Sequence, residues 1–252
     1  MFFLDINIAK YYKSNSQKTR VMTEFWTGEN IFCPSCGKSI YHYDNNKPVA
    51  DFYCNICKED YELKSGKTLG KKITDGAYST MIQRLKSNDN PNFFFLNYTK
   101  HFEISNFMVI PKHYFIPEII EKRKPLIEKA KRAGWIGCNI LLSGIPQSGK
   151  ILYIENGSYR NKKEILNDWT KTLFLRETKS IEGKGWILDI MKCIEMLNKK
   201  DFTLQEMYNF ENILKQKYPN NNFIKDKIRQ QLQFLRNKGY LEFISSGKYK
   251  LL

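Results

Sequence analysis

The chain has 252 residues, with 41 Lys and Arg against 26 Asp and Glu, which gives a net charge of +15. This length allows one large domain, or a medium-sized domain with a small companion. The positive charge indicates a negatively charged partner, for which nucleic acid is the first candidate and an acidic membrane surface the second. No apolar run approaches the roughly 18 residues that span a bilayer, which argues against a membrane protein. The start, MFFLDINIAKYYK, does not resemble a signal peptide, so we expect a cytoplasmic protein.

In chain order, apolar residues at helical spacing predict a helix over residues 5–27, and residues 30–63 indicate cysteine-bearing strands and turns. A second helix is predicted over residues 75–89, with Asp75 or Thr74 near its start. Four strands are then predicted, in NPNFFFLNYTK, HFEISNFMVIPK, GWIGCNILLSGI and GKILYIENG. Helices around a short mixed sheet place this part of the chain in the α/β class.

A polar, glycine-bearing linker at residues 177–185 predicts domains over residues 1–180 and 181–252. The second domain begins with amphipathic helices in WILDIMKCIEMLN and in FTLQEMYNFENILKQ, the latter capped by Asp201 or Thr203. A third helix, FIKDKIRQQLQFLRNKG, has one apolar stripe made of Ile224, Ile228, Leu232 and Leu235. YLEFISSGKYKLL predicts a closing hairpin around Ser-Gly. Helices followed by such a hairpin are typical of a winged-helix domain.

Four of the six cysteines form two Cys-x-x-Cys pairs with 17 residues between them: Cys33, Cys36, Cys54 and Cys57. Four thiolates at this spacing suit a tetrahedral zinc ion. They complete its coordination, so we expect the zinc to be structural rather than catalytic. His42 would be a fifth ligand and is expected at the surface or in packing. Cys138 and Cys193 have apolar neighbours and are expected to be small buried side chains.

The second cysteine pair lies between an aspartate and a Glu-x-Lys triplet. If Cys54 pairs with Cys57 at the tip of a hairpin, Asp51 lies opposite residue 60 with Glu62 as its diagonal neighbour. Glu62 and Lys64 point to one side of their strand and Leu63 to the other, so we expect Asp51, Glu62 and Lys64 to converge. The two carboxylates and the Leu63 carbonyl offer oxygen ligands to Mg²⁺, and Lys64 could orient or deprotonate a water for phosphodiester hydrolysis. The alternative is an ordinary solvated hairpin face, because such triplets arise by chance in basic proteins.

PVADFYCN with ELK resembles the PD-(D/E)xK nuclease signature, with Pro48 two places earlier than the signature implies. Over nearly its full length the chain resembles the DpnI-like methyl-directed type II restriction endonucleases, through YKSNSQK, TDGAY, NPNFFFLNYTK, KRAGWIGCNI, LFLR, IRQQLQFLR and GKYKLL. The resemblance implies a PD-(D/E)xK restriction-endonuclease-like mixed sheet flanked by helices, with an inserted structural zinc, and a C-terminal winged helix.

The resemblance also implies a function, Mg²⁺-dependent cleavage of double-stranded DNA at GATC sites that contain 6-methyladenine, within a restriction-modification system. Asp51, Glu62 and Lys64 match the family's catalytic positions, and the four paired cysteines match its zinc ligands. Glu24, on the first predicted helix, is a further candidate carboxylate near the magnesium.

Candidate DNA-contacting residues lie outside the apolar stripe of the third C-terminal helix and on the hairpin: Lys225, Arg229, Gln230, Gln233, Asn237, Lys248 and Lys250. An adenine methyl group needs an apolar or aromatic wall, for which Trp135 and Trp186 are candidates. Arg132, beside Trp135, could contact the DNA backbone or a guanine. The alternatives are core packing for either tryptophan and an ordinary basic surface for the helix.

The residues and the resemblance together favour a type II site-specific deoxyribonuclease that acts as a monomer, because no seam for a dimer is evident. The rival hypothesis is a zinc-ribbon and winged-helix DNA-binding regulator that does no chemistry. Both hypotheses predict salt-sensitive DNA binding. They differ on incubation with Mg²⁺ and plasmid bearing methylated GATC sites, which the enzyme would cut and the regulator would leave intact.

Overall fold

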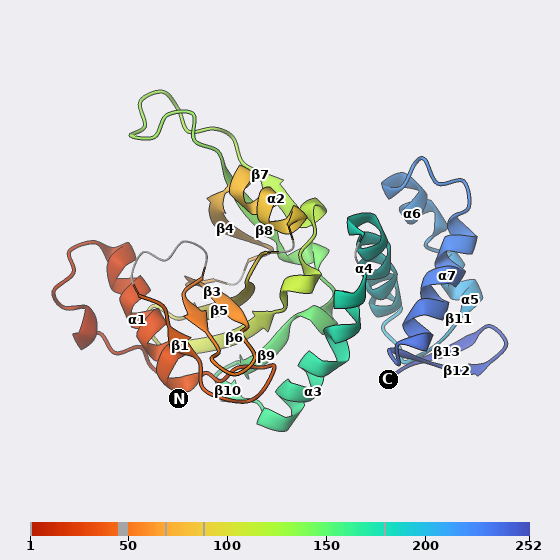
Figure 1. The fold of residues 1–252 in the computed structure, drawn as a ribbon, viewed down its shortest axis with the longest axis horizontal. Helices are drawn as coiled ribbons and strands as arrows, with labels where there is room; N and C mark the ends of the chain where they lie inside the picture. The colour runs from red at the N-terminus through yellow and green to blue at the C-terminus, as the bar shows by residue number, and fades with distance from the viewer. Residues whose placement is uncertain (1, 45–49, 69, 88, 179) are drawn as a thin grey trace. The chain divides into compact units, whose positions relative to one another are not determined.

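The computed structural model of the protein describes residues 2–44, 50–68, 70–87, 89–178 and 180–252. The chain divides into two compact units, one containing residues 1–144 and 148–173 and the other residues 145–147 and 174–252 (Figure 1). The domain boundary at residues 180 and 181 stays a prediction. Pro48, which belongs to the nuclease-like signature, lies outside the described residues.

The larger unit is built on a seven-stranded mixed sheet with the order β1-β2-β3-β5-β6-β9-β10 (Figure 1). Strands β3 and β5 run parallel, and the other described neighbours are antiparallel. Every residue of β5 is buried, as its continuous apolar run predicts. The bounds of these strands are β1 Tyr41–His42, β2 Phe52–Tyr53, β3 Asp60–Gly66, β5 Asn92–Tyr98, β6 Ile104–Ile110, β9 Ile151–Glu155 and β10 Ser158–Tyr159.

Helices α1 (Asn15–Asn30) and α3 (Lys162–Thr172) contribute to the main core of the larger unit. Trp26 of α1 and Trp169 of α3 join the aromatic side chains of the sheet, and Trp169 is fully buried. Each large side chain buried in this way contributes roughly 1.5–3 kcal/mol to stability. This core therefore holds the central strands in place.

A second, three-stranded sheet of the larger unit has the order β4-β8-β7, and helix α2 (Tyr78–Lys86) contacts all three strands. The strands are β4 Lys72–Ala77, β7 Ile120–Lys122 and β8 Gly137–Leu141. Between β7 and β8 the chain projects as an arm, residues 123–136, which Figure 1 shows extending from these two strands. Short 3-10 helices complete the unit or join the two units: η1 Asn7–Ala9, η2 Lys112–Tyr114, η3 Pro117–Ile119, η4 Leu142–Gly144, η5 Gln147–Gly149 and η6 Leu173–Glu177.

The C-terminal unit contains helices and a small sheet with the order β11-β13-β12. Its predicted apolar stripe is confirmed, because Ile224, Ile228, Leu232 and Leu235 are all buried. Gly239 has a φ of 70° directly after the third predicted helix, where glycine adopts the left-handed conformation at low cost. The bounds are α4 Ile181–Met196, β11 Asp201–Thr203, α5 Leu204–Tyr208, α6 Glu211–Lys217, α7 Ile224–Asn237, β12 Leu241–Ser245 and β13 Lys248–Leu251.

Four predicted helices differ from the observed elements, and one of them, predicted from Trp186, begins at Ile181 within the predicted linker. The first begins at Asn15, not residue 5, because Ser14 is extended and precedes the helix; a 3-10 turn lies before it. The second begins at Tyr78, because Thr74 and Asp75 pair with β8 as part of β4. The helix predicted in FTLQEMYNFENILKQ is a strand and two short helices, with Thr203 and Glu206 forming a capping box at the first of them.

The mixed α/β class predicted from the sequence is confirmed, and helix α3 is an additional element that was not predicted. Within the described residues, none of the helices has the length and apolar composition needed to cross a membrane.

Candidate active site and metal centre

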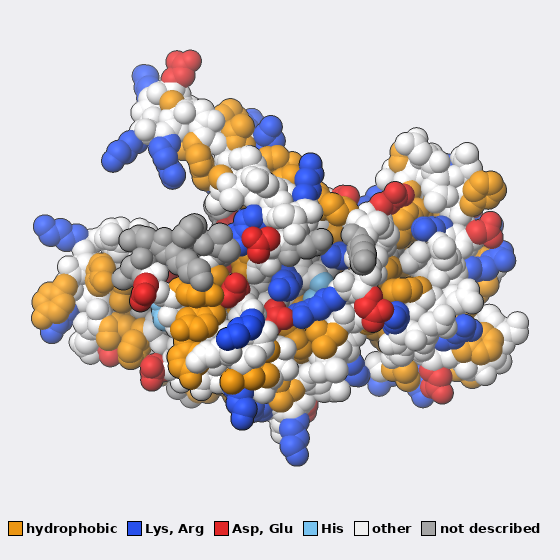
Figure 2. Space-filling model, viewed as in Figure 1, with side chains coloured by type: hydrophobic (Ala, Val, Ile, Leu, Met, Phe, Trp, Pro, Cys, Tyr) orange, Lys and Arg blue, Asp and Glu red, His pale blue; other side chains and the backbone are white. Residues whose placement is uncertain are grey.

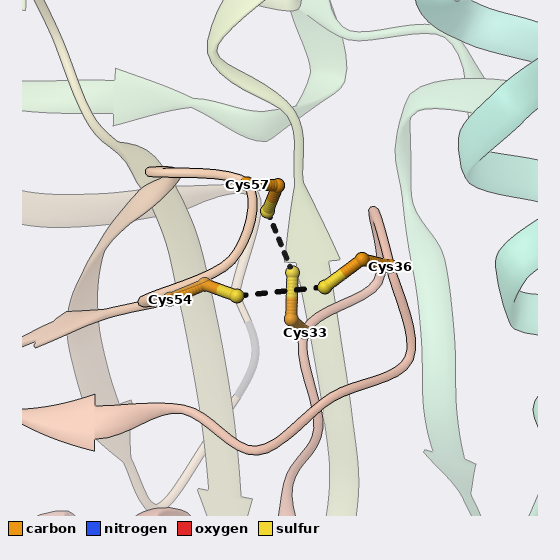
Figure 3. Close-up of side chains that lie close together, drawn as sticks. All are labelled: Cys33, Cys36, Cys54 and Cys57. Carbon is orange, nitrogen blue, oxygen red and sulfur yellow. Dashed lines mark hydrogen bonds between the residues drawn. The ribbon is translucent and has the colours of Figure 1, made fainter.

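The four paired cysteines form one cluster. Their sulfur atoms all lie within 4.8 Å of one another, and Figure 3 shows the side chains of Cys33, Cys36, Cys54 and Cys57 pointing toward a common centre. Burial raises the pKa of the Cys54 thiol, but the backbone amides of Cys57 and Ile56 outweigh burial and lower that pKa to about 7. A cluster of four thiols, one of them ionised easily, is suited to hold a metal ion.

The cysteine cluster is joined to strand β3 by a buried tyrosine. The hydroxyl of Tyr61 lies 3.1 Å from the sulfur of Cys33, and the Tyr61 side chain is fully buried. Its ring stacks on Phe94 of the neighbouring strand β5, with ring centres 4.5 Å apart. A hydrogen bond to a ligand atom orients that ligand, so Tyr61 fixes both the cluster and the strand that carries Glu62.

Strand β3 presents different chemistry on its two faces. Tyr61 belongs to the main core and the partly buried Leu63 packs against it, so Glu62 and Lys64 point to the opposite face. The parallel register with β5 places Phe93 beside Glu62 and Phe95 beside Lys64 on that face. Burial raises the pKa of Glu62, and the carboxylates of Asp75 and Asp51 add to this shift while Lys64 opposes it. The predicted alternation along β3 is confirmed.

Asp51 lies at the level of Glu62, two residues away from its predicted register. The observed pairing joins Phe52 with Tyr61 and Tyr53 with Asp60. The turn is longer than predicted, because the amide of Cys54 bonds the carbonyl of Glu59 and Lys58 adopts a φ of 58°. The Asp51 carboxylate accepts a hydrogen bond of 2.7 Å from the Leu63 amide, which directs it toward β3. In the observed register Asp51 lies closer to Glu62 along the strand than in the predicted one.

Lys64 is held by two carboxylates at once. Its ammonium nitrogen lies 2.5 Å from Glu62 Oε1 and 2.5 Å from Asp75 Oδ1. Burial lowers the pKa of Lys64, but Glu62 and Asp75 outweigh it and raise the pKa above its usual value. Asp75 is not at the start of a helix, as its sequence neighbours predict; it lies on β4, directly against the Lys64 side chain.

Helix α1 adds a further acid and a base beside Asp51. Glu24, a buried residue, accepts a hydrogen bond of 2.6 Å from Arg20 and lies 3.2 Å from His42 Nε2. The pKa of Arg20 is raised mainly by Glu24, with a smaller contribution from Asp51, so Arg20 faces both acids. His42 also packs edge-on against Phe52. Among the described residues, the group of side chains that could hold a metal ion consists of the four cysteines and does not include His42.

A cavity of about 1010 Å³ opens beside this group of charged residues. Its wall includes residues from α1, β3, β4 and β5, among them Arg20, Glu24, Lys64, Lys72 and Asn97. Of the charged groups of the candidate site, Arg20, Glu24 and Lys64 therefore border a space that a ligand can enter, whereas Asp51, Glu62 and Asp75 do not belong to its wall. The other two cysteines are poor nucleophiles at neutral pH, because burial raises the pKa of Cys138 to about 11 and that of Cys193 to about 12.

The arm carries one group of candidate DNA-contacting residues. Figure 2 shows Lys and Arg side chains gathered on it, and residues 122–132 contain six Lys and Arg against one Glu. The guanidinium of Arg132 lies over the Trp135 ring at 4.8 Å from its centre, and Trp135 is half-buried. Arg132 and Trp135 are thus neighbours on one basic, accessible element.

Helix α7 carries the second group. Lys225, Arg229, Gln230, Gln233 and Asn237 are exposed on it, and Lys248 and Lys250 are exposed on the neighbouring hairpin. Arg229 donates a hydrogen bond to the Tyr208 hydroxyl. Trp186, by contrast, is 1% exposed and stacks on Tyr218 with ring centres 3.7 Å apart. The structure therefore places Trp186 in the core of the C-terminal unit, the alternative that the sequence left open.

Comparison with known proteins assigns both units. The family model described as "DpnI: Dam-replacing family" matches residues 1–178. The model described as "Dam-replacing HTH domain" matches residues 182–251. The first match contains the cysteine cluster, the charged group on β3 and the arm, and the second contains α7 and its hairpin.

We expect Lys64→Met, which removes the charge and keeps much of the side-chain length, to lower the free energy of unfolding by about 3 kcal/mol at neutral pH. Glu62 and Asp75 would then be partly buried without a cation, which raises the folded-state pKa of Glu62 further above its usual value. A carboxyl whose pKa is raised by folding destabilises the fold more as pH rises. The loss of unfolding free energy caused by Lys64→Met should therefore be smaller at pH 5 than at pH 8. Urea unfolding at both pH values measures it.

Lys72→Met provides the matched control. Lys72 also lies 2.5 Å from a carboxylate, that of Glu121, but these side chains are 54% and 36% exposed. An exposed pair contributes about 1 kcal/mol or less. Two results would contradict a partly buried charge cluster at Lys64: an equal loss of unfolding free energy in the two variants, or a loss in Lys64→Met that does not depend on pH.

Proposed function

The chain belongs to the Dam-replacing family, and from that premise we propose that it is a methyl-directed type II restriction endonuclease. Its substrate in this proposal is double-stranded DNA at GATC sites that contain 6-methyladenine, and its reaction is phosphodiester hydrolysis. The observation that carries the proposal is the group formed by Asp51, Glu62 and Lys64 on and beside strand β3, within the matched residues.

The donor set fits a magnesium ion. The carboxylates of Asp51 and Glu62 are hard oxygen ligands, and the Leu63 carbonyl would be the third. The ammonium of Lys64 already occupies a cation position against Glu62, which supports a positive ion there. When bound, Mg²⁺ would stabilise the charge on the attacked phosphate and acidify a water. We assign the group to the PD-(D/E)xK type on this basis.

The residues of the chain have separable roles in this proposal. Lys64 holds positive charge beside the phosphate and orients the attacking water, because its ammonium offers three donors. Asp51 and Glu62 hold the metal ligand positions, and the Leu63 amide keeps the Asp51 carboxylate oriented. Phe93 and Phe95 limit the water around Glu62 and Lys64, which strengthens the electrostatic interactions there.

We assign zinc to the cysteine cluster as a structural ion. Four sulfur ligands close a tetrahedral shell and leave no position for a substrate. The role of the ion would be to fix the loop between β2 and β3, and with it the register that aligns Asp51 with Glu62. Reduced thiols are maintained in the cytoplasm, where we place the protein.

The two groups of basic residues serve DNA recognition in this proposal. Helix α7 would enter the major groove, with Arg229, Gln230 and Gln233 toward the bases and Lys225 and Lys248 toward phosphates. Arg132 and Trp135 on the arm would contact the modified adenine and its surroundings. We expect the protein to act as a monomer.

Incubation with Mg²⁺ and plasmid bearing methylated GATC sites tests the activity. We expect the methylated plasmid to be cut and the same plasmid without methylation to stay intact, because the methyl group is part of the recognised surface. Gel electrophoresis of the two digests measures this. A protein that binds methylated DNA and leaves it uncut is the regulator of the rival hypothesis.

Lys64→Met should abolish cutting while duplex binding stays within a few-fold of wild type, because Lys64 acts on the reacting phosphate. Cleavage rates and fluorescence anisotropy with methylated duplex measure the two properties, at a temperature where circular dichroism shows the variant folded. Lys171→Met, at an exposed position of α3 that does not line the cavity, is the control for loss of one positive charge. Cutting by Lys64→Met at the wild-type rate would remove Lys64 from the mechanism.

Cys36→Ser should lose the single equivalent of zinc that we expect in the wild-type protein, because three thiolates hold the ion far more weakly than four. Elemental analysis of the purified proteins measures the metal. Cys193→Ala is the matched control, since Cys193 is a buried cysteine of the other unit and should leave the zinc content unchanged. Full zinc occupancy in Cys36→Ser would show that the cluster is not the zinc site.

A further inference from the structure

Asp75 is a charged residue on the inward side of strand β4. Burial alternates along this strand, so Ile73, Asp75 and Ala77 share the less exposed side. The Asp75 side chain is 6% exposed, and its backbone pairs with Cys138 of β8. A carboxylate in such a position costs stability unless a cation compensates it. Its partner is Lys64, which belongs to the other sheet.

Lys64 is therefore the link between two acids that come from different sheets. Glu62 and Lys64 lie on β3 of the seven-stranded sheet, and Asp75 lies on β4 of the three-stranded sheet. Both carboxylates lie 2.5 Å from the same nitrogen. A lysine side chain has a flexible four-carbon stem, so its position depends on which of these two anchors holds it.

We propose that Asp75 is a positioning residue that keeps Lys64 at the active site while Glu62 binds the divalent cation. This inference rests on the proposed nuclease function. A cation at Glu62 competes directly with the Lys64 ammonium for the same carboxylate. Asp75 gives Lys64 a second anchor, so Glu62 is released to the metal and Lys64 remains beside it.

Two consequences follow from losing the Asp75 charge. Lys64 would have Glu62 as its one remaining carboxylate partner among the pairs described, so it would compete more strongly with the cation. Once the cation had taken Glu62, the Lys64 stem would be free to leave the reacting phosphate. The first consequence weakens metal binding and the second slows the reaction, whereas contact with the DNA away from this point is unaffected.

Asp75→Asn is the informative variant, because it has the same shape and lacks the charge. We expect kcat on methylated duplex to fall about 10- to 100-fold, the range for residues that orient groups at a metal site. We also expect weaker binding of Ca²⁺ to the protein–DNA complex, measured by calorimetry without turnover. Duplex affinity in the absence of divalent ions should be no lower than that of wild type. Asp75→Glu, which restores the charge, should recover part of kcat.

Glu121→Gln is the matched control. It breaks the Lys72–Glu121 pair of the same three-stranded sheet, which has the same 2.5 Å separation but lies at the surface. It should change neither kcat nor Ca²⁺ binding. Melting temperatures of all three variants establish that the proteins compared are folded.

Wild-type kcat and Ca²⁺ affinity in Asp75→Asn would overturn the inference. So would an Asp75→Asn protein that is unfolded or fails to bind duplex and is not improved by Asp75→Glu, since Asp75 would then be structural. If the wild-type protein itself does not cut methylated DNA, the proposed nuclease function fails. The Ca²⁺ titration would still show whether Asp75 controls cation access to Glu62.

Discussion

The pairing of strand β2 with strand β3 is the constraint on which the candidate active site depends. These strands pair over a short stretch, Phe52 with Tyr61 and Tyr53 with Asp60, and a pairing this short specifies its register weakly by itself. The cysteine cluster closes one end of the pair, and the hydroxyl of Tyr61 contacts Cys33 within it. The other end is held by the Asp51 carboxylate on the Leu63 amide. A slip of one residue would turn Glu62 into the core, so these contacts protect the chemistry as well as the fold.

Side chains that stabilise the fold and side chains of the candidate active site alternate along strand β3 and so lie on its opposite faces. Tyr61 and Leu63 pack into the main core, where the apolar area that they bury stabilises the unit. Glu62 and Lys64 face Asp75 across the space between two sheets, in a setting where opposite charges must compensate one another. The aromatic neighbours on β5 reduce the local water and so strengthen each of these interactions. The cost of keeping several charges here is the physical reason to regard the group as functional.

No local pattern in the sequence indicates the partners that reach this group from other elements. Asp75 was predicted near a helix start because Thr and Asp before an apolar run are common caps, yet pairing with β8 outweighs that local preference. Arg20 lies on the same helix as Glu24 and is recognisable as part of the site only once α1 packs beside Asp51. Trp135 and Trp186 are both candidates from the sequence, but Trp186 is buried under Tyr218 and Trp135 lies on the arm.

What the sequence determined by itself is the set of features with local periodicity or fixed spacing. These are the two cysteine pairs, the alternation of Glu62, Leu63 and Lys64, the buried strand β5 and the apolar stripe of α7, because each follows from the geometry of a single segment. Tertiary structure alone decided the β2–β3 register, through the length of the turn at Lys58, and the meeting of Lys64 with Asp75. Contacts between separate sheets depend on how the whole core packs, and no single segment encodes that.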